Sequence, residues 1–127
     1  MAVEEKRLYP RLSLKLEDGC FGHFKLANGE SLSVPIINLS AGGINVIVPQ
    51  KMVHKIKEGD LLMLKNIAGA ASLQFLNDIK ADIRWIKPLE RSDYLSVGCR
   101  FKELSEPVRQ QLGRFVDAER MARGQYT

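Results

Sequence analysis

The chain has 127 residues, of which 45% are hydrophobic, and its formal net charge is +4 at pH 7. This is enough apolar material for one core, and we expect a single domain over residues 1–127. The 15 acidic residues are scattered along the chain, so the charge favours a small phosphorylated ligand over a nucleic acid as the partner. No apolar run is long enough to span a membrane, and no signal peptide opens the chain. We therefore expect a cytoplasmic protein without membrane insertion.

The sequence offers little for catalysis or metal binding. Cys20 and Cys99 are far apart, and neither has a second cysteine at metal-ligand spacing. We interpret them as buried free thiols. No nucleophile is paired with a base, and Asp82 is interpreted as part of a solvated strand face. We therefore expect no enzyme activity, no cofactor and no metal.

The segment "KRLYPRL", residues 6–12, places two arginines around a proline. Pro10 fixes its own φ and keeps Tyr9 out of the helical region, so this stretch should be extended. In an extended chain Arg7 and Arg11 project from one face, roughly 13 Å apart. A guanidinium binds phosphate with two hydrogen bonds and matches the edge of guanine. The segment 1–11 is either a flexible ligand-binding arm or a solvated basic arm.

Short strands with turn residues between them predict an antiparallel β-barrel over residues 12–103. Leu12, Leu14 and Leu16 alternate with polar residues and predict a first strand that ends at an Asp-Gly turn. Asn28 and Gly29 predict a type I′ hairpin, and Pro35 indicates an edge strand or a bulge. Strands are predicted at 20–26, 32–37, 44–48, 61–67, 72–75, 79–87 and 94–101, with one helical turn in the connection 51–60.

The last segment changes from the strand period to the helical one. Ser105 can cap a helix whose first turn contains Pro107, and Leu112 and Val116 follow four residues apart. We predict an amphipathic helix over residues 105–123. The expected fold is therefore mainly β: a small antiparallel barrel of six to seven strands with a C-terminal α-helix.

The second candidate motif is "NLSAGG", residues 38–43. Asn38 and Ser40 are two apart at the end of a strand and should share one face, and the glycines let the backbone come close to a ligand. Such a group could hold a phosphate or a base edge. The same residues are also common in ordinary turns, and that interpretation stays open here.

Together the two motifs resemble the PilZ domain family. The family pattern is an Arg-x-x-x-Arg arm before the first strand, met by Arg7 and Arg11, followed by Asp/Asn-x-Ser-x-x-Gly, met by Asn38, Ser40 and Gly43. The segment "VGCRFKEL" and the helix after it resemble the last barrel strand and C-terminal helix of that family, so the likeness covers nearly the whole chain.

The resemblance implies a bacterial receptor for the second messenger cyclic di-GMP. In that family the two arginines contact guanine and phosphate, which carries to Arg7 and Arg11, and the Asp/Asn and Ser positions hydrogen-bond to the ligand, which carries to Asn38 and Ser40. The glycine, here Gly43, keeps the backbone close. Many members have Asp where this chain has Asn38, which keeps an acceptor, adds a donor and removes a charge.

Trp85 is the only tryptophan, and two roles are open for it. Alternation places it on the face of Ile79 and Ile83, which indicates the core. Some PilZ domains, however, stack a guanine on an aromatic residue at the matching position, which makes Trp85 a further candidate site residue. Arg84 and Arg100 are candidates for phosphate contact or for solvated positions.

We expect cyclic di-GMP to order the arm against the barrel and so to signal to a separate, unidentified protein partner. Two alternatives remain. One is a small barrel that binds single-stranded nucleic acid. The other is a PilZ-like adaptor that contacts proteins without binding a nucleotide. The sequence does not determine the downstream pathway, the oligomeric state or the affinity. It also leaves the stoichiometry open, either one cyclic di-GMP or a stacked pair.

Overall fold

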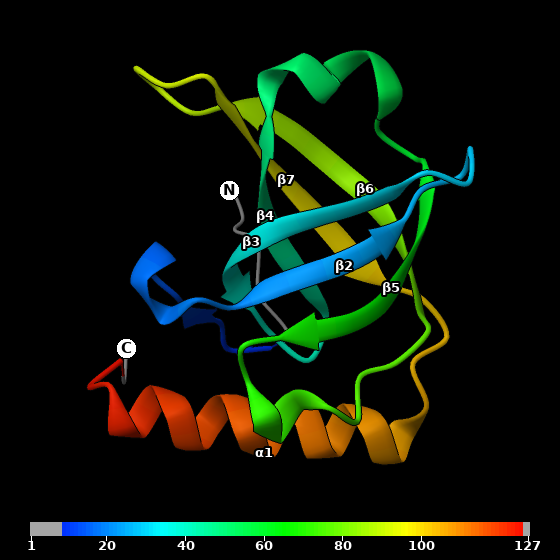
Figure 1. Ribbon diagram of the computed structural model, residues 1–127. Coiled ribbons are helices and arrows are strands. Elements are labelled where there is room, and N and C mark those ends of the chain that lie inside the picture. Colours follow the sequence, from blue (N-terminus) through cyan, green and yellow to red (C-terminus); the bar gives the residue numbers. More distant parts are fainter. Residues whose placement is uncertain (1–8, 126–127) are drawn as a thin grey trace, which may run out of the picture.

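The computed structural model describes residues 9–125 (Figure 1). The strands are β1 (Leu12–Ser13), β2 (Phe21–Lys25), β3 (Ser31–Leu39), β4 (Gly43–Pro49), β5 (Leu61–Ala68), β6 (Ile79–Pro88) and β7 (Tyr94–Phe101). Three 3₁₀ segments, η1 (Leu16–Asp18), η2 (Gln50–Lys55) and η3 (Ala71–Leu73), lie between them, and the helix α1 (Glu106–Ala122) follows. The helical turn expected between β4 and β5 is present as η2.

Six of the strands close into an antiparallel barrel in the order β2-β5-β6-β7-β4-β3, because β3 also pairs with β2. β3 can do this because its two ends have different partners: Ser31 to Pro35 pair with β2, whereas Ile36 to Leu39 pair with β4. Its register against β4 shifts between Ile36 and Asn38, just beyond Pro35. The short β1 is an extra strand on β3. The predicted barrel with a C-terminal helix is confirmed.

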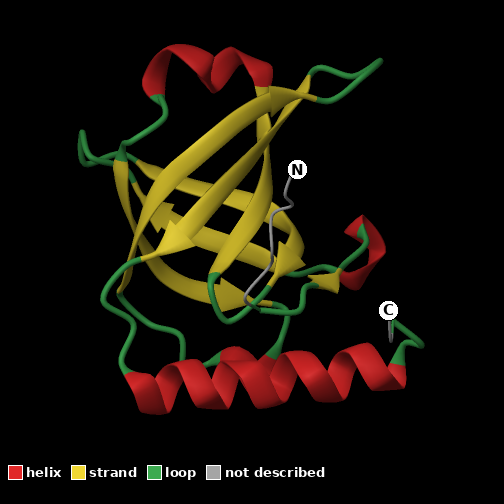
Figure 2. Ribbon diagram, turned by 180° about the vertical axis from the view of Figure 1, so that it is seen from behind, coloured by secondary structure: helices red, strands yellow, loops and turns green. Residues whose placement is uncertain are grey.

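The core fills the barrel. The helix covers one end of the barrel (Figure 2). In β4 the side chains alternate, so that Val46 and Val48 are buried while their neighbours face outward. Ser105 caps α1 by accepting a hydrogen bond from the Val108 N–H at 3.4 Å. Leu112 and Val116 are the buried residues of α1. The four-residue spacing that predicted the helix therefore also marks the face that packs on the barrel.

The first predicted strand is much shorter than expected. Only Leu12 and Ser13 pair, and Leu16 is exposed in η1 instead of continuing the strand. The cause is local, since Asp18 accepts a hydrogen bond from the Lys15 N–H at 2.7 Å and bends the chain into a 3₁₀ turn. Gly19, with φ of 69°, then ends that turn.

Two further details of the prediction were wrong. The β2–β3 hairpin is not type I′, because in the pair Asn28-Gly29 only Gly29 has positive φ, at 91°. The Leu26 carbonyl accepts a hydrogen bond from the Gly29 N–H, and the Leu26 N–H donates to the Glu30 carbonyl. These bonds close a three-residue loop with the glycine in the left-handed position. Residues 72–75 form no strand, because the N–H groups of Leu73, Gln74 and Leu76 each donate to the carbonyl three residues earlier, the hydrogen-bond pattern of the 3₁₀ segment η3 and the turn after it.

No helix within residues 9–125 is long and apolar enough to cross a membrane. Cys20 and Cys99 are buried free cysteines, as the sequence predicted.

Candidate functional site

A groove of about 200 Å³ lies on the outer face of the barrel, where β3, β4, β6 and β7 adjoin. Its lining comes from the segment before β1, the β3–β4 loop and the strand faces. The lining residues are Tyr9, Arg11, Asn38, Ser40, Gly42, Gly43, Ile44, Asn45, Trp85, Gly98, Cys99 and Arg100. Five of the six residues that the two motifs and Trp85 contribute are thus brought together. The sixth, Arg7, lies outside the described residues.

The β3–β4 loop is held in shape by its own serine. Ser40 is buried, and its Oγ accepts hydrogen bonds from the Gly42 N–H at 3.0 Å and the Gly43 N–H at 3.2 Å. The Ser40 N–H in turn donates to the Gly43 carbonyl at 2.9 Å. Because the hydroxyl accepts both of these bonds, its own proton stays available to donate to a further acceptor.

A side chain on either glycine of this loop would meet a neighbouring atom, although neither glycine has a positive φ. A Cβ on Gly43 would lie 2.2 Å from the carbonyl oxygen of Cys99 on β7. A Cβ on Gly42 would lie 2.8 Å from Cδ2 of the Tyr9 ring. Gly43 therefore lets β4 approach β7, and Gly42 lets the chain before β1 pack on the loop.

Trp85 does not lie on the face of Ile83, contrary to the alternation in the sequence. The β6–β7 register shifts between Ile83, which pairs with the inward-facing Cys99, and Trp85, which pairs with the outward-facing Gly98. This bulge adds one residue and turns the indole to the outside of the barrel, where it lines the groove. The core interpretation of Trp85 is wrong, and the ring is half-buried at the site.

The family model for the PilZ domain matches residues 5–118. This chain belongs to the PilZ domain family. No curated protein sequence matches this PilZ domain.

Solved structures share the fold of this PilZ domain. The MrkH–c-di-GMP complex of K. pneumonia matches with a TM-score of 0.76 at 19% identity, covering 98% of this chain and 57% of that one. The PilZ domain of Escherichia coli YcgR with c-di-GMP has a TM-score of 0.68 at 23% identity, covering 95% and 97%. YcgR in complex with c-di-GMP matches with a TM-score of 0.68 at 25% identity, covering 95% and 49%. This PilZ domain thus spans about half the length of MrkH and of the longer YcgR chain.

Two arginines line the groove of this PilZ domain. Arg11 and Arg100 both line it, and Nη2 of Arg100 lies 3.2 Å from Oδ2 of Asp82, a largely buried carboxylate. The other oxygen, Oδ1, is buried without a hydrogen-bond partner among the described residues. Asp82 therefore holds the Arg100 guanidinium against the barrel wall that β6 and β7 form. The interpretation of Asp82 as part of a solvated strand face was wrong.

The thiol in the groove wall is not a nucleophile. Burial, with a smaller contribution from the charge of Asp82, raises the pKa of Cys99 to about 12. The side chain is therefore a neutral thiol at physiological pH, whereas a reactive cysteine needs a lowered pKa. Within residues 9–125, no group of three or more histidine, cysteine or acidic side chains is arranged to hold a metal ion.

Sequence reasoning missed Asn45 and Tyr9 as parts of this site. Asn45 lies opposite Asn38 across β3 and β4, and its Oδ1 accepts a hydrogen bond from the buried Ser96 hydroxyl at 3.0 Å. The alternation of β4 would have placed Asn45 on the outer face. Tyr9 carried no comparable signal, because its place depends on contacts with Gly42 and with Arg109 of α1.

Proposed function

We propose that this PilZ domain is a receptor for cyclic di-GMP that binds the dinucleotide in the groove and catalyses no reaction. One observation carries the proposal: a single groove is lined by Arg11, Asn38, Ser40, Gly43 and Trp85. The first four of these residues belong to the two motifs, and Trp85 is the candidate aromatic residue. The MrkH and YcgR structures of the same fold are complexes with c-di-GMP, which supports the same ligand here.

The groove supplies the types of contact that a guanine dinucleotide needs. The Arg11 guanidinium can bind a phosphate or the O6 and N7 edge of guanine. Ser40 offers a hydroxyl proton, and Asn38 offers an amide that can both donate and accept. The indole of Trp85 offers a surface on which a guanine can stack. Arg7 would complete the arm four residues before Arg11.

In this proposal the ligand is held between the barrel wall and the arm. Binding changes the arm conformation, and the surface made by arm and ligand is then read by a separate protein. The partner itself is not identified by any feature of the groove. Its recognition would depend on a surface that forms only when cyclic di-GMP is present.

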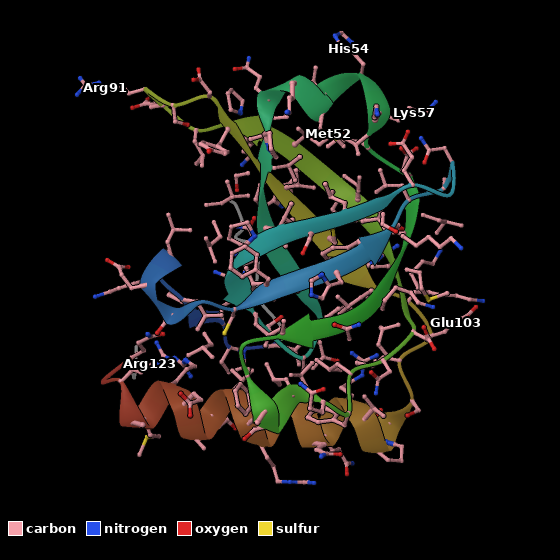
Figure 3. The ribbon with its side chains drawn as sticks, in the orientation of Figure 1. Met52, His54, Lys57, Arg91, Glu103 and Arg123 are labelled. Atoms are coloured by element: carbon pink, nitrogen blue, oxygen red, sulfur yellow. The ribbon has the colours of Figure 1, made fainter. Side chains whose placement is uncertain are left out.

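Calorimetric titration with cyclic di-GMP tests the proposal and gives the stoichiometry. Arg11→Ala and Ser40→Ala should each weaken binding about tenfold or more, since a hydrogen bond to a charged group contributes roughly 1.5–3 kcal/mol. Arg91→Ala is the matched arginine control, because Arg91 is exposed at the β6–β7 loop (Figure 3). Lys57→Ala is a second control on the exposed β4–β5 connection. No heat at tens of micromolar ligand would refute the proposal.

The nucleic-acid alternative has weak support within residues 9–125. The two exposed aromatic side chains that could stack on bases are Phe21 on β2 and Tyr94 on β7. These strands are not neighbours in the barrel, so the two rings do not form one stacking platform. Salt-sensitive binding of oligonucleotides without competition by cyclic di-GMP would favour this alternative. A protein that binds neither ligand would point to the adaptor.

A further inference from the structure

Arg109 in the first half of α1 contacts three separate parts of the chain. Its Nη1 donates a hydrogen bond to the Ala41 carbonyl in the β3–β4 loop at 3.0 Å. Its guanidinium carbon lies 5.4 Å from the centre of the Tyr9 ring. Its Nε lies 3.9 Å from Oε1 of Glu106, one turn earlier on the helix. The side chain is mostly buried, with 24% exposed.

These contacts join the helix to two edges of the groove. Ala41 is itself buried and stands between Ser40 and Gly42, which both line the groove. Tyr9 also lines the groove, and its ring packs on Gly42. Arg109 therefore holds the loop backbone and the Tyr9 ring at the same time, and Arg11 follows two residues after the ring.

The chemistry of arginine suits this double contact. A guanidinium is planar, so it can donate in its plane to a carbonyl and lie against an aromatic ring. A lysine ammonium on a flexible stem could replace the hydrogen bond but lacks the flat surface. Within residues 9–125, the carboxylate that pairs with Arg109 is that of Glu106, which does not line the groove. Arg109 thus contributes geometry to the site without occupying the space that a ligand would take.

We propose that Arg109 is a positioning residue that keeps the groove in its binding shape by fixing Tyr9 and the β3–β4 loop to α1. The proposal rests on cyclic di-GMP binding in this groove. When a binding-competent arrangement is only partly populated, the apparent affinity falls by that fraction. Loss of Arg109 should therefore weaken binding although the residue does not touch the ligand. By linkage, the ligand should also stabilise the loop and the start of α1.

Hydrogen exchange of the ligand-free protein tests the positioning role without any ligand. Arg109→Met keeps the aliphatic stem but removes the guanidinium. The Gly42 and Gly43 amides should then exchange roughly tenfold faster, because their bonds to Ser40 depend on a fixed loop. Arg114→Met, at an exposed position on the same helix, is the control and should leave both amides unchanged. Unchanged exchange in Arg109→Met would overturn the proposal.

Calorimetry of the same variants tests the effect on affinity. Arg109→Met should raise the Kd for cyclic di-GMP about fivefold or more, and Arg109→Lys should fall between it and the wild type. Tyr9→Leu should raise the Kd by a similar factor, and the double variant should be no worse than either single one. A lowered unfolding temperature with an unchanged Kd would show a merely structural role and would overturn the proposal.

The two proposals fail in different ways. If the wild-type protein binds no cyclic di-GMP, the proposed function is refuted, and the claim about affinity falls with it. The exchange comparison then still decides whether Arg109 fixes the loop. If the wild type binds and Arg109→Met binds equally well, only the positioning proposal is refuted.

Discussion

Trp85 and Gly98 face each other across β6 and β7, and the indole occupies the space that a side chain at Gly98 would fill. A Cβ on Gly98 would lie 2.3 Å from Cε2 of the indole and 2.6 Å from Nε1. The glycine therefore lets the ring lie against the barrel wall beside the groove. The position of the aromatic surface depends on a residue that has no side chain of its own.

Gly98→Ala should displace the indole and weaken cyclic di-GMP binding. The new methyl group cannot share the space of Cε2, so the ring has to move away from the wall. The wavelength of tryptophan emission should shift in the ligand-free protein, and the Kd from calorimetry should rise. Gly113→Ala is the matched control, because a Cβ there meets no atom within 4 Å. An unchanged emission spectrum and Kd would contradict this account of the pair.

Trp85→Ala should weaken cyclic di-GMP binding, because it removes a stacking contact that is worth about 1–3 kcal/mol per base. Trp85→Phe should retain part of the affinity, because a smaller ring still offers a face to guanine. Since Trp85 is the only tryptophan, addition of ligand should quench the intrinsic fluorescence of the wild type. Equal Kd values for the wild type and Trp85→Ala would exclude a stacking role.

Gly43→Ala and Gly42→Ala should have different effects. At Gly43 the new Cβ meets the Cys99 carbonyl, which is backbone, so β4 and β7 must separate and stability should fall by about 1–3 kcal/mol. At Gly42 it meets the Tyr9 ring, which can turn aside. That variant should unfold near the wild-type temperature but bind cyclic di-GMP less tightly. Thermal unfolding and calorimetry measure the two effects, and equal loss of stability in both variants would be contrary evidence.

The Asp18 carboxylate should make stability depend on pH in the acidic range. The Lys15 N–H at 2.7 Å and Nη1 of Arg123 at 3.1 Å lower the pKa of Asp18 below its ordinary value of 3.8, in that order of importance. A group with a lowered pKa stabilises the folded state above its ordinary pKa and loses that effect as the pH falls through the folded value.

Denaturant unfolding of the wild type and of Asp18→Asn checks this prediction. Near neutral pH the wild type should be the more stable protein, and the gap should shrink once the pH falls below about 4. Because Asp18 and Arg123 are partly exposed, the effect should be small and should weaken in high salt. A gap that stays constant down to pH 2 would show that the carboxylate charge does not matter.

Local patterns in the sequence were sufficient for most of the architecture. Period-two alternation located the barrel strands, such as β4 with Val46 and Val48 facing inward. Ser105 and the spacing of Leu112 and Val116 located the helix. These signals are strong because each records which side of one element meets the core. They failed at η1 and η3, where short-range hydrogen bonds and the burial of Leu73 override the pattern.

Four positions of the two motifs, Arg11, Asn38, Ser40 and Gly43, line one groove, in agreement with the resemblance that singled them out. What the sequence could not determine is the side of the barrel on which Trp85 lies. That depends on a register shift between β6 and β7, which arises from pairing of two whole strands. Likewise, Arg109 reaches Ala41 and Tyr9 only because barrel closure brings the helix, the β3–β4 loop and Tyr9 together. Contacts between segments about 70 or 100 residues apart have no local periodicity, so only the tertiary structure decides them.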